Sequence, residues 1–241
     1  MAGLVALLSG PWLRVTDITW TGEHYTRQRD LERLIGPLFG ANLLAVDTAA
    51  LRQQLGRLPP VASVAVAATL PGRVEVTIQE REATFVWETA SARLLGAADG
   101  TLFAALGRDQ ALAPEQAGLP RITDQRAMGR LMTTGDRIDE PMLRTALRLA
   151  DLDPAMLGSE APSVAVRIDD EYGFRLVAAG PAWEVALGTY GTDPAETSAG
   201  AQARLERQIA AVRTLFAGRP ETEVGWIDVR NPGKVYFRAK G

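Results

Sequence analysis

The chain has 241 residues, 46% of them hydrophobic and 23% charged, and a formal net charge of −3, which is an ordinary globular composition of one or two domains. The absence of cysteine excludes disulfides, thiolate catalysis and Cys-ligated metals, and a single histidine, His24, excludes His-paired metal sites and leaves one base for a Ser-His triad. No lysine-rich run occurs, which argues against a nucleic-acid or anionic-membrane surface and favours a binding or scaffolding role.

The chain begins with an apolar run over residues 2–8, which Ser9-Gly10-Pro11 ends. The run is much shorter than the ~20 residues that span a bilayer, and no basic residue precedes it as in a signal peptide. Two interpretations stay open: a loose apolar tail packed on the following domain, or the outer end of a transmembrane helix whose first half lies outside this chain.

The first 81 residues predict the order β-α-α-β-β. Strands are expected over 13–21, with the apolar residues Val15, Ile18 and Trp20, over 61–70, with Val64, Val66 and Ala68 on one face, and over 74–79. The first helix is capped by Thr26 and has Leu31, Leu34, Ile35 and Leu38 on one face. The second helix is capped by Asp47 and has Leu51, Leu55 and Leu58 on its face. Because the strands alternate apolar and polar residues, we expect a three-stranded sheet with both helices on the same side.

The motifs of this region resemble the POTRA domain of the FtsQ/DivIB family of bacterial cell-division proteins. The resemblance rests on "VTDITWTGEHYT", "GANLLAVDTAAL" and "LRQQLGRLPPVASVAVAATLPGRVEVTIQEREA". The matching positions, in order, are Gly22, Asn42-Leu43, Asp47, Leu58-Pro59 with Val61, Pro71 and Glu80-Arg81. Each of these residue types is common at the ends of helices and strands, so the resemblance depends on their joint spacing.

After Arg81 the pattern changes to shorter strands, and we place a domain boundary near residue 82. Strands are expected over 85–88, 93–95, 101–104, 163–168, 174–178, 183–187, 224–229 and 235–239. One helix is expected over 139–152, capped by Asp139, with Met142, Ala146, Leu149 and Leu152 on its apolar face. A second helix is expected to have Leu205, Ile209, Val212 and Phe216 on its apolar face. Residues 105–137 show little periodicity and are predicted to be a surface excursion.

The second half also resembles the FtsQ β domain, through "EVALGTYG" and "WIDVRNPGKVYFR", with Asp228 and Arg230 at the family's Asp and Arg positions. The resemblance is weak over 105–160. It implies an α+β protein in three parts: residues 1–11, an apolar remnant of an N-terminal membrane helix; residues 12–81, the POTRA domain; and residues 82–241, a mostly antiparallel sheet domain with helices.

Few residues suggest catalytic or metal chemistry. His24 lies in a predicted turn without a second imidazole or thiol, and Asp169-Asp170-Glu171 lie between two predicted strands without calcium-loop spacing, so both are expected to be exposed turn residues. Asp228 and Arg230 lie two apart on one strand and are expected to form a structural ion pair. Phosphate-loop, nucleophile-elbow and zinc-helix motifs are absent from the sequence.

The last predicted strand alternates two kinds of side chain. Val235, Phe237 and Ala239 share one face, and Lys234, Tyr236 and Arg238 share the other. Lysine and arginine protect edge strands, and an edge can also accept a partner's strand, so the residues alone leave both interpretations open. The resemblance favours the second, because the family captures the membrane-anchored protein FtsB (DivIC) at this strand, with FtsL alongside.

The resemblance therefore implies a non-enzymatic divisome scaffold without metal or cofactor. It would be anchored in the cytoplasmic membrane by one helix, would lie mostly outside the cytoplasm at the septum, and would link FtsB/DivIC and FtsL to FtsW/FtsI-type peptidoglycan synthases. The implied partner-binding residues are Asn231, Lys234, Val235, Tyr236, Phe237 and Arg238. A POTRA chaperone module of an outer-membrane assembly or secretion system is the alternative, and an enzyme using Asp169, Asp170 or Asp228 is a third hypothesis.

Overall fold

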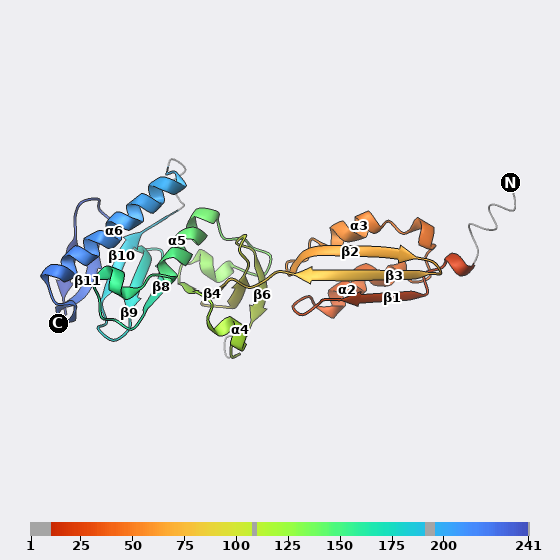
Figure 1. Cartoon of the computed structure of the whole chain (residues 1–241), viewed down its shortest axis with the longest axis horizontal. Coiled ribbons are helices and arrows are strands. Elements are labelled where there is room, and N and C mark those ends of the chain that lie inside the picture. Colours follow the sequence, from red (N-terminus) through yellow and green to blue (C-terminus); the bar gives the residue numbers. More distant parts are fainter. Residues whose placement is uncertain (1–10, 108–109, 191–195, 241) are drawn as a thin grey trace. The chain divides into compact units, whose positions relative to one another are not determined.

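The fold was analysed in a computed structural model, which describes residues 11–107, 110–190 and 196–240 (Figure 1). The chain divides into two compact units, of which the first ends at Glu82 and the second begins at Ala83. The expectation for residues 1–10 lies outside the described residues. Among the helices that the structure describes, none is both long enough and apolar enough to cross a membrane.

The smaller unit is a three-stranded sheet covered on one face by two helices. Its elements are η1 (Pro11–Leu13), β1 (Asp17–Thr21), α2 (Gln28–Ile35), η2 (Gly36–Leu38), η3 (Leu43–Ala45), α3 (Thr48–Leu55), β2 (Val61–Thr69) and β3 (Arg73–Glu80). The central strand β3 is parallel to β1 and antiparallel to β2. One face of β3, formed by Val74, Val76 and Ile78, is buried in the same cluster as Leu31 of α2 and Leu51 of α3, so both helices lie on one side, as the strand alternation predicts.

Two details of this unit differ from the sequence prediction. The first strand begins at Asp17, because residues 11–13 form a short helix and the backbone N–H groups of Thr16 and Asp17 both donate to the carbonyl of Gly72. Thr26 does not cap α2, which begins after Arg27 without a side-chain cap. The Asp47 cap is confirmed, since its carboxylate accepts from the backbone N–H groups of the first turn of α3.

Thr26 instead belongs to a polar contact between the start of α2 and the end of β3. The Glu80 carboxylate accepts hydrogen bonds from the backbone N–H groups of Tyr25 (2.8 Å) and Thr26 (2.7 Å) and from the Thr26 hydroxyl. Burial opposes ionisation of Glu80, but these hydrogen bonds lower its pKa below the ordinary value. The Glu80 carboxylate thus binds the Thr26 side chain and the backbone just before α2, and the first turn of the helix is left without a side-chain cap.

The larger unit is built on a nine-stranded sheet in the order β12-β11-β10-β9-β8-β7-β4-β5-β6. The strands are β4 (Phe85–Thr89), β5 (Arg93–Gly96), β6 (Leu102–Leu106), β7 (Arg121–Asp124), β8 (Val164–Asp169), β9 (Gly173–Ala178), β10 (Glu184–Gly188), β11 (Val224–Asp228) and β12 (Tyr236–Ala239). Most neighbouring strands are antiparallel; the parallel pairs are β10 with β11, β7 with β8 and β4 with β7. The chain is thus an α+β protein with a POTRA-like unit and a mostly antiparallel sheet.

Two long helices pack against this sheet. They are α5 (Glu140–Ala150) and α6 (Ser198–Gly218). The unit also contains the short helix α4 (Pro114–Ala117) and the short turns η4 (Met128–Leu131), η5 (Pro154–Leu157) and η6 (Glu221–Glu223). The predicted apolar face of α6, from Leu205 to Phe216, is buried in one cluster with Ala146 and Leu149 of α5 and with Val185 and Ile227 of the sheet. In Figure 1 both helices run across the sheet in this unit.

The prediction of a surface excursion over 105–137 is wrong for residues 121–124, although most of the segment's described residues are exposed or half-buried. The segment contains β7, which lies inside the sheet between β4 and β8 and is parallel to both. Only four residues long, β7 is too short to show an alternating pattern, and one of its two fully buried residues, Ile122 and Asp124, is a carboxylate.

Asp124 is satisfied by its surroundings. Its carboxylate accepts from Nε1 of Trp87 (3.2 Å), from Nε (2.9 Å) and Nη2 (2.7 Å) of Arg126, and from the backbone N–H of Arg126 (3.1 Å). A Cβ at Gly129 would lie 2.6 Å from this carboxyl group, so the following turn passes directly over it. The buried charge is therefore paired and hydrogen-bonded, as such groups must be.

Candidate partner-binding edge

The last strand of the chain is an edge of the large sheet. β12 pairs antiparallel with β11, with Asp228 opposite Tyr236 and Ile227 opposite Phe237, and it has no second neighbour among the described strands. Its outer side therefore presents backbone N–H and C=O groups that a further strand could pair with. The strand is short and Arg238 lies on it, which are both features that limit unspecific pairing.

The side chains of this edge are more apolar at the surface than a merely protected edge requires. Val235, Tyr236 and Phe237 are 37%, 49% and 40% exposed. The Arg219 guanidinium lies 4.6 Å from the Phe237 ring centroid, whereas Arg238 lies 5.7 Å from that of Trp226. Successive side chains thus cover opposite faces, as the alternation predicts, and both faces of the edge offer contact surface.

A groove of about 500 Å³ runs between α6 and the turn that joins β11 to β12. It is lined from α6 by Arg204, Arg207, Gln208, Ala211, Thr214 and Leu215, and from the turn by residues 229–235. These lining residues include the cations Arg204, Arg207, Arg230 and Lys234 and no carboxylate. Since Val235 is shared between the groove and the edge, the two form one continuous surface, hereafter the edge and groove.

The turn is held by the pair of Asp228 and Arg230, whose predicted ion pair is confirmed at 2.7 Å. Arg230 lies just beyond β11 and not on it, because the strand ends at Asp228. Its guanidinium also donates to the Glu171 carbonyl (3.2 Å) and lies 5.0 Å from the Tyr172 ring centroid. The hydrogen bond from Arg230 lowers the pKa of Asp228, which stays ionised and fixes the start of the turn.

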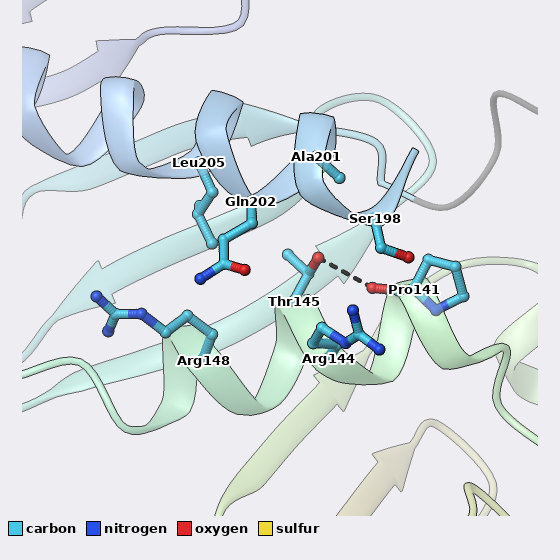
Figure 2. A pocket seen from close by; sticks show the side chains of 8 residues that line it. All are labelled: Pro141, Arg144, Thr145, Arg148, Ser198, Ala201, Gln202 and Leu205. Atoms are coloured by element: carbon cyan, nitrogen blue, oxygen red, sulfur yellow. Dashed lines mark hydrogen bonds between the residues drawn. The ribbon is translucent and has the colours of Figure 1, made fainter. Parts of the chain in front are cut away.

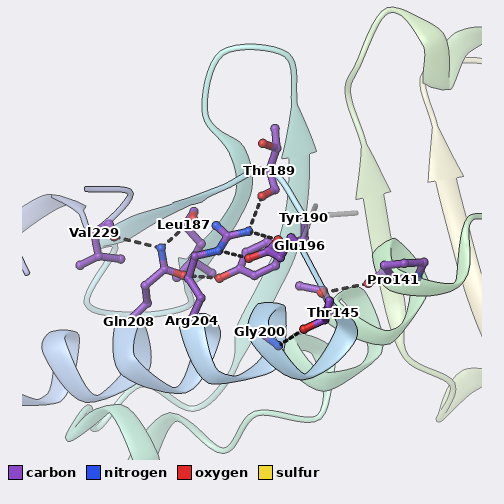
Figure 3. A network of polar contacts seen from close by, with 11 residues as sticks. Pro141, Thr145, Leu187, Thr189, Tyr190, Glu196, Gly200, Arg204, Gln208 and Val229 are labelled. Carbon is purple, nitrogen blue, oxygen red and sulfur yellow. Dashed lines mark hydrogen bonds and ion pairs between the residues drawn. The ribbon is translucent and has the colours of Figure 1, made fainter. Parts of the chain in front are cut away.

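The floor of the groove rests on a buried polar network that the sequence analysis missed (Figure 3). Gln208 donates through Nε2 to the carbonyls of Leu187 and Val229, each at 2.9 Å, and accepts from the Tyr190 hydroxyl. These bonds join α6 to the ends of β10 and β11. A signal was present, since Gln208 interrupts the apolar stripe of the helix between Leu205 and Ile209.

Tyr190 is enclosed by the same network. Burial raises the pKa of the Tyr190 phenol to about 12, against the favourable charge of Arg204, whose Cζ lies 3.8 Å from the ring centroid. Arg204 in turn pairs with Glu196 (2.8 Å) and donates to the carbonyl of Thr189 (2.8 Å). The ion pair with Glu196 and the hydrogen bond to Thr189 therefore hold Arg204, which lines the groove, in place.

Of the other sequence candidates, His24 and Asp170 lie in exposed turns as expected, whereas Asp169 is the last residue of β8, is half-buried and pairs with Arg175 at 2.6 Å. His24 is exposed, and its ring contacts that of Tyr25. Asp169 accepts from the backbone N–H groups of Glu171 and Tyr172 at the β8–β9 turn, and Asp170 accepts from that of Ala127. No group of histidine or carboxylate side chains able to hold a metal ion occurs in the described residues.

A second hollow lies between α5 and α6 (Figure 2). Its volume is about 110 Å³, and Pro141, Thr145, Ala201 and Leu205 contribute to a mostly apolar lining. The two arginines at its rim are engaged elsewhere, Arg144 with Glu140 and Arg148 with Glu206. The hollow is thus a small packing gap at a helix crossing and adds nothing to the edge and groove.

Comparison with known proteins points in the same direction as the motifs. Residues 13–81 match the family model described as POTRA domain, FtsQ-type. The chain is 27% identical over 166 residues to "Cell division protein FtsQ" of Streptomyces griseus, an alignment that covers 68% of this chain and 76% of that protein. It is 32% identical over 99 residues to the protein of the same name from Rhizobium meliloti (strain 1021), covering 41% of this chain and 32% of that protein.

Proposed function

We propose that this chain is a member of the FtsQ/DivIB family of cell-division proteins and acts in the divisome as a non-enzymatic scaffold that captures an FtsB/DivIC-like protein at β12. The captured segment adds as a strand to β12 and contacts Asn231, Lys234, Val235, Tyr236, Phe237 and Arg238. An FtsL-like protein binds alongside, and the assembly connects to FtsW/FtsI-type synthases. The POTRA domain and the two relatives support the division role.

The observation that carries the binding mode is the unpaired side of β12, flanked by exposed apolar side chains. Strand addition gives affinity through main-chain hydrogen bonds and specificity through side-chain pockets. The groove beneath Val235 is such a pocket. Two of its cations, Arg204 and Arg230, are paired with Glu196 and Asp228, so Arg207 and Lys234 are the charges that favour a partner segment with carboxylates next to apolar residues. From the same likeness, we propose that the protein lies at the cytoplasmic membrane of the septum, with most of the chain outside the cytoplasm.

The test is a calorimetric titration of the chain with the extracytoplasmic segment of the same organism's FtsB/DivIC-like protein. Tyr236→Pro and Phe237→Pro are compared, because N–H groups of adjacent strand residues point to opposite sides and one of the two prolines must remove an outward donor. That variant is expected to abolish binding. Phe237→Ala is expected to weaken it by about tenfold or more, as for an aromatic contact residue.

The control is Leu131→Ala, which removes an apolar side chain of η4 that is more exposed (69%) than Phe237 (40%), and it is expected to leave binding unchanged. His24→Ala is a second neutral control. Circular dichroism establishes that each variant is folded. If both proline variants are folded and bind like the unaltered chain, strand addition at β12 is wrong; if the unaltered chain binds neither the FtsB/DivIC-like nor the FtsL-like segment, the scaffold role itself fails.

A further inference from the structure

The smaller unit exposes four large apolar side chains that its core does not use. Trp12, Phe39, Leu44 and Leu70 are 54%, 68%, 61% and 66% exposed. They lie on three separate segments, over 11–16, 36–47 and 70–72. Single exposed apolar residues are common and need no explanation, but several that gather in one place mark a contact surface.

Backbone hydrogen bonds bring the three segments together at one end of the unit. The N–H of Val15 donates to the carbonyl of Ala41 (2.9 Å), and that of Gly40 donates to the carbonyl of Val15 (2.8 Å). The N–H of Thr16 donates to the carbonyl of Gly72 (2.8 Å), in the turn between β2 and β3. We call this surface, formed by residues 11–16, 36–47 and 70–72, the loop end; in Figure 1 it lies where the β2 arrow ends and β1 begins.

Each of the first two segments sends neighbouring apolar residues in opposite directions. Leu13 and Leu43 are 5% exposed and belong to the core, whereas Trp12 and Leu44, their direct neighbours in sequence, face outward. The exposed side chains of Trp12 and Leu44 therefore point away from the core that their neighbours fill.

The loop end carries little charge. Its segments contain one carboxylate, Asp47, which caps α3, and one basic residue, Arg14. Arg73, which begins the adjacent strand, is paired with Asp17 at 2.9 Å. A surface of this composition makes an apolar contact without a strong charge preference.

We propose that the loop end rests on a lipid bilayer, with Trp12, Phe39, Leu44 and Leu70 inserted among the headgroups. Tryptophan prefers the membrane–water interface, where its amphipathic ring is half in water, and leucine and phenylalanine bury beside it. A bilayer is the fitting occupant because the apolar run of residues 2–8 leads directly into Trp12, so any membrane that takes up this run also meets the loop end. The contact lies in the smaller unit and does not depend on strand capture at β12.

The natural lack of cysteine allows a direct test on the full chain. Leu44→Cys and Leu70→Cys each receive a nitrobenzoxadiazole label, whose emission shifts to the blue and brightens in an apolar environment. The labelled proteins are mixed with vesicles of equal parts phosphatidylcholine and phosphatidylglycerol. Leu131→Cys, at a position 69% exposed in the larger unit, is the matched control.

Labels at positions 44 and 70 are expected to shift to the blue and to be quenched by spin-labelled lipid, whereas the label at 131 stays unchanged. Vesicles of phosphatidylcholine alone are expected to give the same shift, because the contact is apolar. The double variant Leu44→Ser with Leu70→Ser is expected to lower the vesicle partition coefficient about tenfold.

Unshifted labels at 44 and 70 would overturn the proposal, whether or not the protein sediments with the vesicles. An equal shift at position 131 would also overturn it, since adsorption would then be unspecific, as would a shift that requires phosphatidylglycerol and disappears in high salt. None of these results affects the titration with the FtsB/DivIC-like segment, so the two proposals fail separately.

Discussion

The buried carboxylate of Asp124 is expected to be essential for the stability of the larger unit. Asp124→Ala leaves Nε1 of Trp87 and the guanidinium of Arg126 without their shared acceptor. Removing one member of a buried ion pair costs about 3–5 kcal/mol. Because the Arg126 side chain is 20% exposed and can reach water, we expect the lower part of that range, about 3 kcal/mol.

The assay is urea unfolding followed by tryptophan fluorescence, with the change in unfolding free energy taken from the transition of the larger unit. Asp170→Ala is the matched control, because this neighbouring carboxylate is exposed and accepts one backbone hydrogen bond, from Ala127. Its removal is expected to cost less than about 1 kcal/mol.

Asp124→Asn keeps the measurement informative should the alanine variant not fold. The amide retains one oxygen for Trp87 or Arg126 but loses the charge, so an intermediate loss is expected. A loss below about 1 kcal/mol for Asp124→Ala, no greater than for the exposed control, would refute the reasoning that the paired carboxylate holds β7 in the sheet.

Three further predictions concern single positions. Gly22→Ala is expected to destabilise the smaller unit by more than about 2 kcal/mol in urea unfolding, because the φ of Gly22 is +92° and a Cβ would lie 2.0 Å from the Ile78 carbonyl oxygen. Gly36→Ala is the control and is expected to be nearly neutral, because a Cβ at Gly36 would meet open space. Equal effects of the two substitutions would contradict this prediction. The pKa of Glu80 is lowered on folding, so its contribution to the free energy of unfolding is fully present above the ordinary pKa of 4.5 and is lost as pH falls through the lower pKa of the folded state. Glu80→Gln is expected to remove this part of the dependence of stability on acid pH. An unchanged dependence in the variant would argue against the prediction. Burial raises the pKa of Tyr190 from 10 to about 12, so the contribution of the neutral phenol to stability is expected to be fully present below pH 10 and to fall as pH rises toward 12. Tyr190→Phe is expected to remove that fall. A fall of the same size in the variant would refute the prediction.

Much of the fold could be predicted because its signals are local. Val74, Val76 and Ile78 alternate cleanly with polar residues, which determines the buried face of β3. The Asp47 cap and the spacing from Leu205 to Phe216 likewise depend only on residues within a turn or two. The edge position of β12 was inferred from its place at the end of the chain and its basic side chains, and the sheet order has it there.

The mistaken elements lack such signals. β7 has only four residues, and its central place depends on pairing with β4 and β8, which are distant in sequence. Thr26 resembles a helix cap in sequence, but its hydroxyl is taken by Glu80, 54 residues away. Neither contact leaves a periodic pattern, so neither could be deduced by reading along the chain.

By itself the sequence determined the two-part organisation, the POTRA-like order of elements and the alternating faces of the terminal strand, because these follow from side-chain periodicity and turn residues. Only the tertiary structure decided that Gln208 joins α6 to the ends of β10 and β11, that a groove opens beside Val235, and that Trp12, Phe39, Leu44 and Leu70 gather at one end of the POTRA unit. The physical reason is that a binding surface consists of side chains from distant segments, and their positions are set by long-range packing and hydrogen bonds, not by neighbours in the chain.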